Sequence, residues 1–171
     1  MLAIISTKNH SPLSWMIRKM SGSNSSHLAI VFDDKFIIQS NLLGFGMDYY
    51  PTFIKKQTVV KRVDISSELG GEDHIWSDLM DIYGTSDYDL KALFYDGWRF
   101  LLHKTLKIRL PSKNKYNSPN KYLCTEVIGV LDTYLKTHYG FSLGLGSIND
   151  LSAVTPMQVI DAIEASMKGV K

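Results

Sequence analysis

Two residues of the chain stand out for the chemistry they can do: Cys124, its single cysteine, and His27. Cys124 opens a segment whose apolar residues recur at helical spacing, which are Val127, Ile128, Leu131 and Leu135. Unpaired N–H groups in the first turn of a helix lower the pKa of a thiol and can hydrogen-bond a developing oxyanion. Cys124 is therefore a candidate nucleophile. A small apolar side chain that fills the core is the alternative, because free cysteine is usually buried and inert.

His27 is the candidate base for this nucleophile. Among the five histidines it is the one that opens a strongly apolar strand, directly after a loop rich in serine, glycine and asparagine. Its ring is expected at the rim of a sheet against which the cysteine helix can pack. A polar strand end without any catalytic role is the alternative.

Gln39 is the candidate for the residue that orients the imidazole. A connection of three or five residues between the strands of the hairpin places Gln39 and Asn41 on the face of His27, whereas two or four residues place Ser40 there. Gln39 is preferred because it interrupts an apolar run, and a buried polar group needs a partner. Its amide oxygen can accept a ring N–H, but it adds no charge to stabilise the imidazolium.

The charges are unevenly distributed along the chain. Residues 64–89 contain eight acids and no base, whereas residues 104–121 contain six bases and no acid and lead to Cys124. The basic stretch is either a solvated loop or a phosphate-binding surface, and with no nucleic-acid motif beside it no nucleic-acid partner is expected. Together with the helix start and His27, this positive charge predicts a thiol pKa near 6 or 7, below the usual value of about 8.5.

The length and composition predict one domain over residues 1–171. With 44% apolar and 21% charged residues, the chain of 171 residues can bury one substantial core. It has no signal-peptide pattern and no apolar run of ~18 residues, so we expect synthesis in the cytoplasm without a transmembrane segment. A lone cysteine excludes an internal disulfide and a zinc cluster built on cysteines. No cofactor or metal is expected.

The expected elements place these residues in an α+β domain, an antiparallel sheet with the nucleophile helix packed across it. Strands are expected at residues 2–7, 27–32, 35–40 and 58–65, and residues 42–51 are expected to be irregular. Helices are expected at residues 11–20, 75–83, about 87–103, from about 124 to 139, and from Pro156, where Thr155 and Gln158 form a capping box.

Five short motifs in this order resemble the circularly permuted branch of the NlpC/P60 superfamily of papain-like cysteine hydrolases. The resemblance covers nearly the whole chain. The motifs are Ser26-His27, Gln39, Tyr88-Asp89-Leu90, Cys124-Thr125-Glu126 and Thr155-Pro156. It implies a permuted papain-like fold in which Cys124 attacks an amide or ester carbonyl, His27 serves as base and then as acid, and a thioester is released by water or another acceptor. Many relatives carry an acid where this chain has Gln39. Glu126 and Thr125 are expected in capping or supporting roles.

The resemblance implies two substrate classes. Most directly it predicts a peptidase or amidase that acts on peptidoglycan stem peptides; such a protein must reach the wall by a route such as a phage particle, lysis or a dedicated secretion system. The alternatives are acyl-lipid hydrolysis or transfer, and a catalytically degenerate structural or assembly protein. An apolar slot lined by Phe94, Trp98 or Leu101 would favour lipid, and a polar groove bordered by Lys113, Lys115 and Lys121 would favour a wall peptide.

Overall fold

In the computed structural model, the described residues are 1–41, 44–65, 74–84, 86–88 and 121–169, and they combine helices with an antiparallel sheet. In this part of the chain a five-stranded sheet has the order β4-β3-β2-β1-β5, with every neighbouring pair antiparallel. Its strands are β1 (Leu2–Lys8), β2 (His27–Phe32), β3 (Phe36–Asn41), β4 (Gly44–Tyr49) and β5 (Thr58–Asp64). The expected antiparallel sheet is confirmed.

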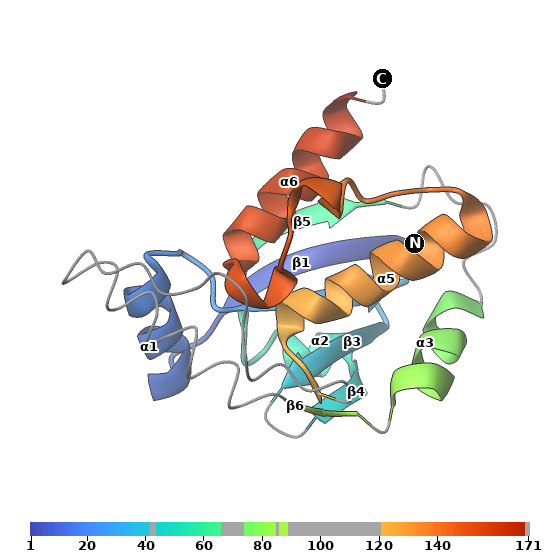
Figure 1. The fold of residues 1–171 in the computed structure, drawn as a ribbon. Coiled ribbons are helices and arrows are strands. Elements are labelled where there is room, and N and C mark those ends of the chain that lie inside the picture. The colour runs from blue at the N-terminus through green and yellow to red at the C-terminus, as the bar shows by residue number, and fades with distance from the viewer. Residues whose placement is uncertain (42–43, 66–73, 85, 89–120, 170–171) are drawn as a thin grey trace.

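Helices pack on both faces of this sheet. The longer ones are α1 (Pro12–Ser21), α3 (Ile75–Tyr83), α5 (Cys124–Tyr139) and α6 (Pro156–Gly169), and α2 (Tyr50–Phe53) is a single turn. The short strands β6 (Asp87–Tyr88) and β7 (Lys121–Tyr122) pair in parallel, and the 3-10 turns η3 (Leu145–Ser147) and η4 (Leu151–Ala153) follow α5. Figure 1 shows α5 and α6 lying across one face of the sheet.

Strand alternation divides the core into two layers, because successive side chains point to opposite faces. Leu28 and Ile30 of β2 belong to the larger cluster, which includes Cys124 and the apolar stripe of α5. Ala29 and Val31 belong to a smaller cluster on the other face, closed by Tyr50 and Phe53 of α2. Helix α5, which begins at Cys124, therefore packs across the sheet as expected, on the face of the larger cluster.

The helix ends follow the capping chemistry that the sequence predicts. The Ser11 hydroxyl accepts from Ser14 N at 3.1 Å at the start of α1. At the start of α6, Thr155 N donates to Gln158 Oε1 at 2.8 Å and Gln158 N donates to Thr155 Oγ1 at 3.2 Å, so the capping box is confirmed.

The prediction that residues 42–51 are irregular is wrong for residues 44–51. Gly44–Tyr49 is a strand paired with β3, and the single turn α2 follows it. Glycines obscured the pattern, because glycine has low strand propensity and carries no side chain to reveal the alternation. Gly44 is required here: its φ is 109°, and a Cβ would lie 2.8 Å from the carbonyl oxygen of Ser86.

The helix predicted from about residue 87 to 103 does not begin at Asp87, because Asp87–Tyr88 pairs as a strand with Lys121–Tyr122. The rest of this prediction, including Asp89 and Leu90, lies outside the described residues, as does the basic stretch from 104 to 120.

Candidate active site

His27 and Gln39 meet on one face of the sheet. Residues 33–35 connect β2 to β3, so the three-residue alternative holds and Gln39 shares the face of His27. The Nε2 atom of His27 lies 2.8 Å from Oε1 of Gln39. This confirms the predicted hydrogen bond and places Ser40 on the opposite face. The connection is possible because Asp33 and Asp34 adopt positive φ angles of 51° and 53°, a conformation that aspartate tolerates.

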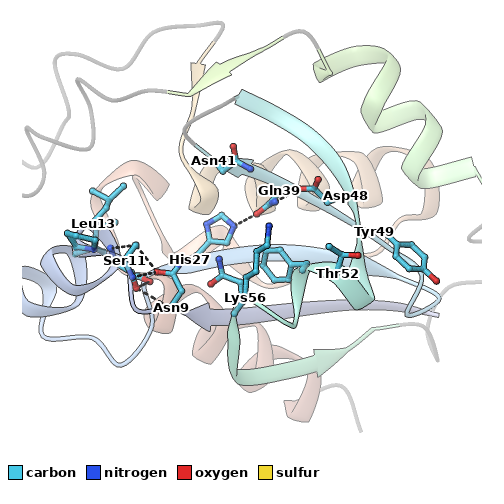
Figure 2. Close-up of a pocket in the computed structure, with 16 residues that line it drawn as sticks. Asn9, Ser11, Leu13, His27, Gln39, Asn41, Asp48, Tyr49, Thr52 and Lys56 are labelled. Atoms are coloured by element: carbon cyan, nitrogen blue, oxygen red, sulfur yellow. Dashed lines mark hydrogen bonds between the residues drawn. The ribbon is translucent and has the colours of Figure 1, made fainter.

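Asp48 extends this pair into a chain of three side chains, as Figure 2 shows. Gln39 is buried, with 5% of its surface exposed, and its Nε2 donates to Oδ2 of Asp48 at 2.6 Å. The sequence analysis does not single out Asp48, because it predicts that the segment containing this residue is irregular. The available signal was the alternation in residues 44–49, which sets Asp48 on the face of Gln39 once these residues are paired with β3.

Burial keeps the His27 ring neutral near pH 7. Removal of the ring from water lowers its pKa from 6.5 to about 4, and the hydrogen bond to Gln39 offsets only part of this effect. The Phe53 ring of α2 contributes to the burial, with its centroid 6.3 Å from that of His27. His27 thus carries a neutral imidazole with one nitrogen engaged by Gln39.

Cys124 is the first residue of α5, as predicted, but its thiol is not activated. The backbone N–H groups of Leu28, Thr125 and Cys124 itself lower the pKa of the thiol, whereas burial raises it more and the Glu126 carboxylate adds to the increase. The resulting pKa is about 11, so the prediction of 6 or 7 is wrong. The side chain is 7% exposed and packs in the larger core cluster, which outweighs the dipoles of the helix start.

Cys124 and His27 come to the same end of β2 but are not hydrogen-bonded to each other. The backbone N–H of Leu28 faces the Cys124 sulfur, and the Leu28 side chain lies on the sheet face under α5. His27 precedes Leu28 in the strand, so its side chain points to the opposite face. Among the described residues there is no hydrogen bond between the thiol and the imidazole, and Cys124 does not line the groove at His27. The structure therefore joins His27 to Gln39 and leaves Cys124 without a hydrogen bond to either side chain.

Glu126 has the capping role that the sequence predicts, since its Oε2 accepts from Leu123 N at 2.8 Å at the start of α5. Thr125 is buried beside Cys124 and contributes its backbone N–H toward the sulfur. Both residues support the first turn of the helix that carries Cys124.

A groove of ≈ 810 Å³ opens over His27, Gln39 and Asp48. Its walls come from α1, from α2 and from the segment that follows α2 (Figure 2). Most of the lining side chains carry hydrogen-bonding or charged groups, among them Asn9, Ser11, Thr52, Lys56 and Gln57, whereas α1 adds Leu13 and Ile17. The Ser14 hydroxyl lies 2.6 Å from that of Ser26 and so joins α1 to the residue before His27.

Residues 1–41, 44–65, 74–84, 86–88 and 121–169 contain no group of three histidine, cysteine, aspartate or glutamate side chains placed to hold a metal ion. None of the helices in these ranges has the length and apolar character needed to cross a membrane. The side chains that would distinguish a lipid from a peptide substrate lie outside the described part of the structure. They are Phe94, Trp98, Leu101, Lys113, Lys115 and Lys121.

Comparison of the chain with models of protein families, with curated proteins and with solved structures finds no match.

Proposed function

We propose that the chain is a cysteine hydrolase that cleaves an amide bond, with Cys124 as nucleophile, His27 as base and Gln39 as the residue that orients the imidazole. The observation that carries the proposal is the hydrogen bond of 2.8 Å between His27 and Gln39, at the strand end where the N–H of Leu28 faces the Cys124 sulfur. A permuted NlpC/P60-like fold of papain type is part of the same proposal.

The pKa values of the two groups decide how the reaction begins. The pKa is about 11 for the thiol and about 4 for the imidazole, so both groups rest in the neutral form and no thiolate–imidazolium pair precedes the attack. Proton transfer from Cys124 Sγ to His27 Nδ1 must accompany formation of the C–S bond. His27 then returns this proton to the leaving nitrogen as the C–N bond breaks. Water, deprotonated by His27, then attacks the thioester; the C–S bond breaks, the acid leaves, and His27 returns the proton to the Cys124 sulfur.

This sequence of steps requires a rearrangement at the start of β2. His27 Nδ1 must come within hydrogen-bonding distance of the Cys124 sulfur, and the substrate carbonyl must reach a thiol that does not line the groove. The movement must keep Nε2 on Gln39 while it brings Nδ1 to the sulfur, because Gln39 is the residue proposed to orient the ring.

The groove supports a peptide substrate such as a peptidoglycan stem peptide. The amide and hydroxyl groups of Asn9, Ser11 and Gln57 suit a peptide backbone, and Lys56 adds a cation that suits a free carboxylate. Acyl-lipid hydrolysis or transfer is the alternative chemistry for the same nucleophile and base.

A catalytically degenerate module for structure or assembly is the second candidate. It is favoured by the burial of Cys124, by the raised pKa of its thiol and by the lack, among the described residues, of a hydrogen bond between the thiol and His27. In that case Cys124 is a core side chain, and the groove serves binding alone.

Incubation with purified peptidoglycan and with acyl-ester substrates, followed by mass spectrometry, tests these functions. Cleaved stem peptides that disappear in Cys124→Ala and His27→Ala, and persist in the control His138→Ala on the exposed side of α5, would support the proposal. Released fatty acid with the same dependence would move the substrate to lipids. Product from neither substrate in the folded wild-type protein, or equal product from wild type and Cys124→Ala, would reject the cysteine hydrolase.

A further inference from the structure

The amide of Gln39 can face His27 with either of two chemically different ends, and only one of them supports His27 as a base. If the oxygen faces the ring, Nε2 of His27 must carry the proton and donate it, which leaves the lone pair on Nδ1. If the nitrogen faces the ring, Nε2 must accept, and Nδ1 then carries the proton.

Asp48 selects between these two orientations. An ionised carboxylate only accepts hydrogen bonds, so the group that faces Asp48 Oδ2 at 2.6 Å must be the amide nitrogen of Gln39. The amide oxygen is then directed at His27 Nε2, at 2.8 Å. The chain of bonds therefore runs from His27 Nε2–H to Gln39 Oε1, and from Gln39 Nε2–H to Asp48.

The sheet holds the three side chains in this order. Gln39 is paired across the strands with Gly46, and Ile37 is paired with Asp48, so Asp48 lies diagonally from Gln39 on the same face. Gly46 has no side chain to intervene between them. Gln39 is buried whereas Asp48 is exposed, so the Asp48 side chain keeps contact with solvent while it accepts from a buried amide.

We propose that Asp48 is a positioning residue that acts through Gln39 to hold His27 in the Nε2–H tautomer, with the lone pair on Nδ1. When His27 becomes an imidazolium, the Asp48 carboxylate also supplies, through Gln39, the negative charge that the Gln39 amide itself lacks. The effect of Asp48 on the His27 tautomer does not depend on the proposed function. Its effect on catalysis rests on the proposed hydrolysis.

Nitrogen-15 NMR of the imidazole tests the tautomer without any substrate. The wild-type protein should show a protonated Nε2 and an unprotonated Nδ1 for His27 at pH 7. In Asp48→Asn the new amide can donate as well as accept, so Gln39 can turn over and the Nδ1–H form should become populated. The exposed carboxylate of Asp81 on α3 provides the matched control, and Asp81→Asn should leave the His27 signals unchanged.

Rescue separates positioning from a general effect on folding. In the double variant Gln39→Glu with Asp48→Asn, a carboxylate faces the ring directly and should restore the Nε2–H form. A His27 tautomer ratio in Asp48→Asn equal to that of wild type would overturn the proposal. So would a double variant that stays in the mixed state while its amide spectrum remains dispersed.

Kinetics distinguish this inference from the proposed function. If the wild type hydrolyses peptide, Asp48→Asn should lower kcat about 10- to 100-fold with little change in KM, because the fraction of competent base falls and substrate contacts remain. A tautomer shift in a wild-type protein without hydrolytic activity would sustain the role of Asp48 and reject the hydrolase. Full activity in Asp48→Asn together with a shifted tautomer would show that the tautomer does not limit catalysis, and would overturn the positioning role.

Discussion

The reactivity of Cys124 toward iodoacetamide follows from its environment. The thiolate is the reacting species, and burial raises the pKa of this thiol to about 11 from 9.0 in water. At pH 8 a thiol with a pKa of 9.0 is about 10% ionised, whereas Cys124 is about 0.1% ionised, which is a difference of roughly 100-fold. Native protein should therefore react at least 100-fold more slowly than protein unfolded in urea, and shielding of a side chain that is 7% exposed slows it further.

The pH dependence gives a sharper form of the same test. The labelling rate, followed by mass spectrometry, should rise about tenfold for each pH unit from 7 to 10 without a plateau, since the thiolate fraction does so below the pKa. His27→Ala should change this profile by less than about threefold, like the control His138→Ala, because the thiol and the imidazole are not hydrogen-bonded and the ring is uncharged. A plateau near pH 7 in the wild type, shifted upward in His27→Ala, would refute this reasoning and would show a thiolate–imidazolium pair.

The other predictions concern stability. The unfolded chain protonates His27 near pH 6.5 and the folded chain only near pH 4, so the free energy of unfolding should fall by roughly 2 to 3 kcal/mol from pH 7 to 4. Urea titrations at both pH values check this, and an equal loss in His27→Gln would contradict it. Thr155→Ala removes one hydrogen bond of the capping box and should lower the free energy of unfolding by about 1 kcal/mol, as measured by thermal unfolding. An unchanged stability would contradict this prediction. Gly144→Ala should destabilise the fold by about 1 to 3 kcal/mol, because φ is 79° and the new Cβ would lie 2.4 Å from Ser166, whereas Gly146→Ala, which meets nothing within 4 Å, should be close to neutral. Equal stability of these two glycine variants would contradict the argument.

Features that depend on neighbouring residues could be predicted from the sequence. The start of α5 at Cys124, the Ser11 cap of α1 and the capping box at Thr155 follow from the residue types at a few adjacent positions. Their hydrogen bonds join residues only three positions apart, so the local residue types are enough to predict them. The hairpin of β2 and β3 was predictable for the same reason, and so were its two possible registers.

The choice between these registers required the tertiary structure. The sequence places either Gln39 or Ser40 beside His27, and the length of the connection decides, because one residue more or less turns every side chain to the other face. The connection consists of residues 33–35, with Asp33 and Asp34 at positive φ angles that their residue type permits but does not impose. Asp48 could be assigned only once β4 was paired with β3.

The state of the thiol was also decided by tertiary structure. The sequence shows a helix start and nearby positive charge, both of which lower the pKa of Cys124. The sequence does not show that this first turn packs against Leu28 and is buried in the larger core cluster. The desolvation that raises the pKa of the thiol to about 11 therefore cannot be predicted from the sequence. Dipole effects arise from adjacent residues and can be read along the chain, whereas desolvation depends on every segment that packs around the sulfur.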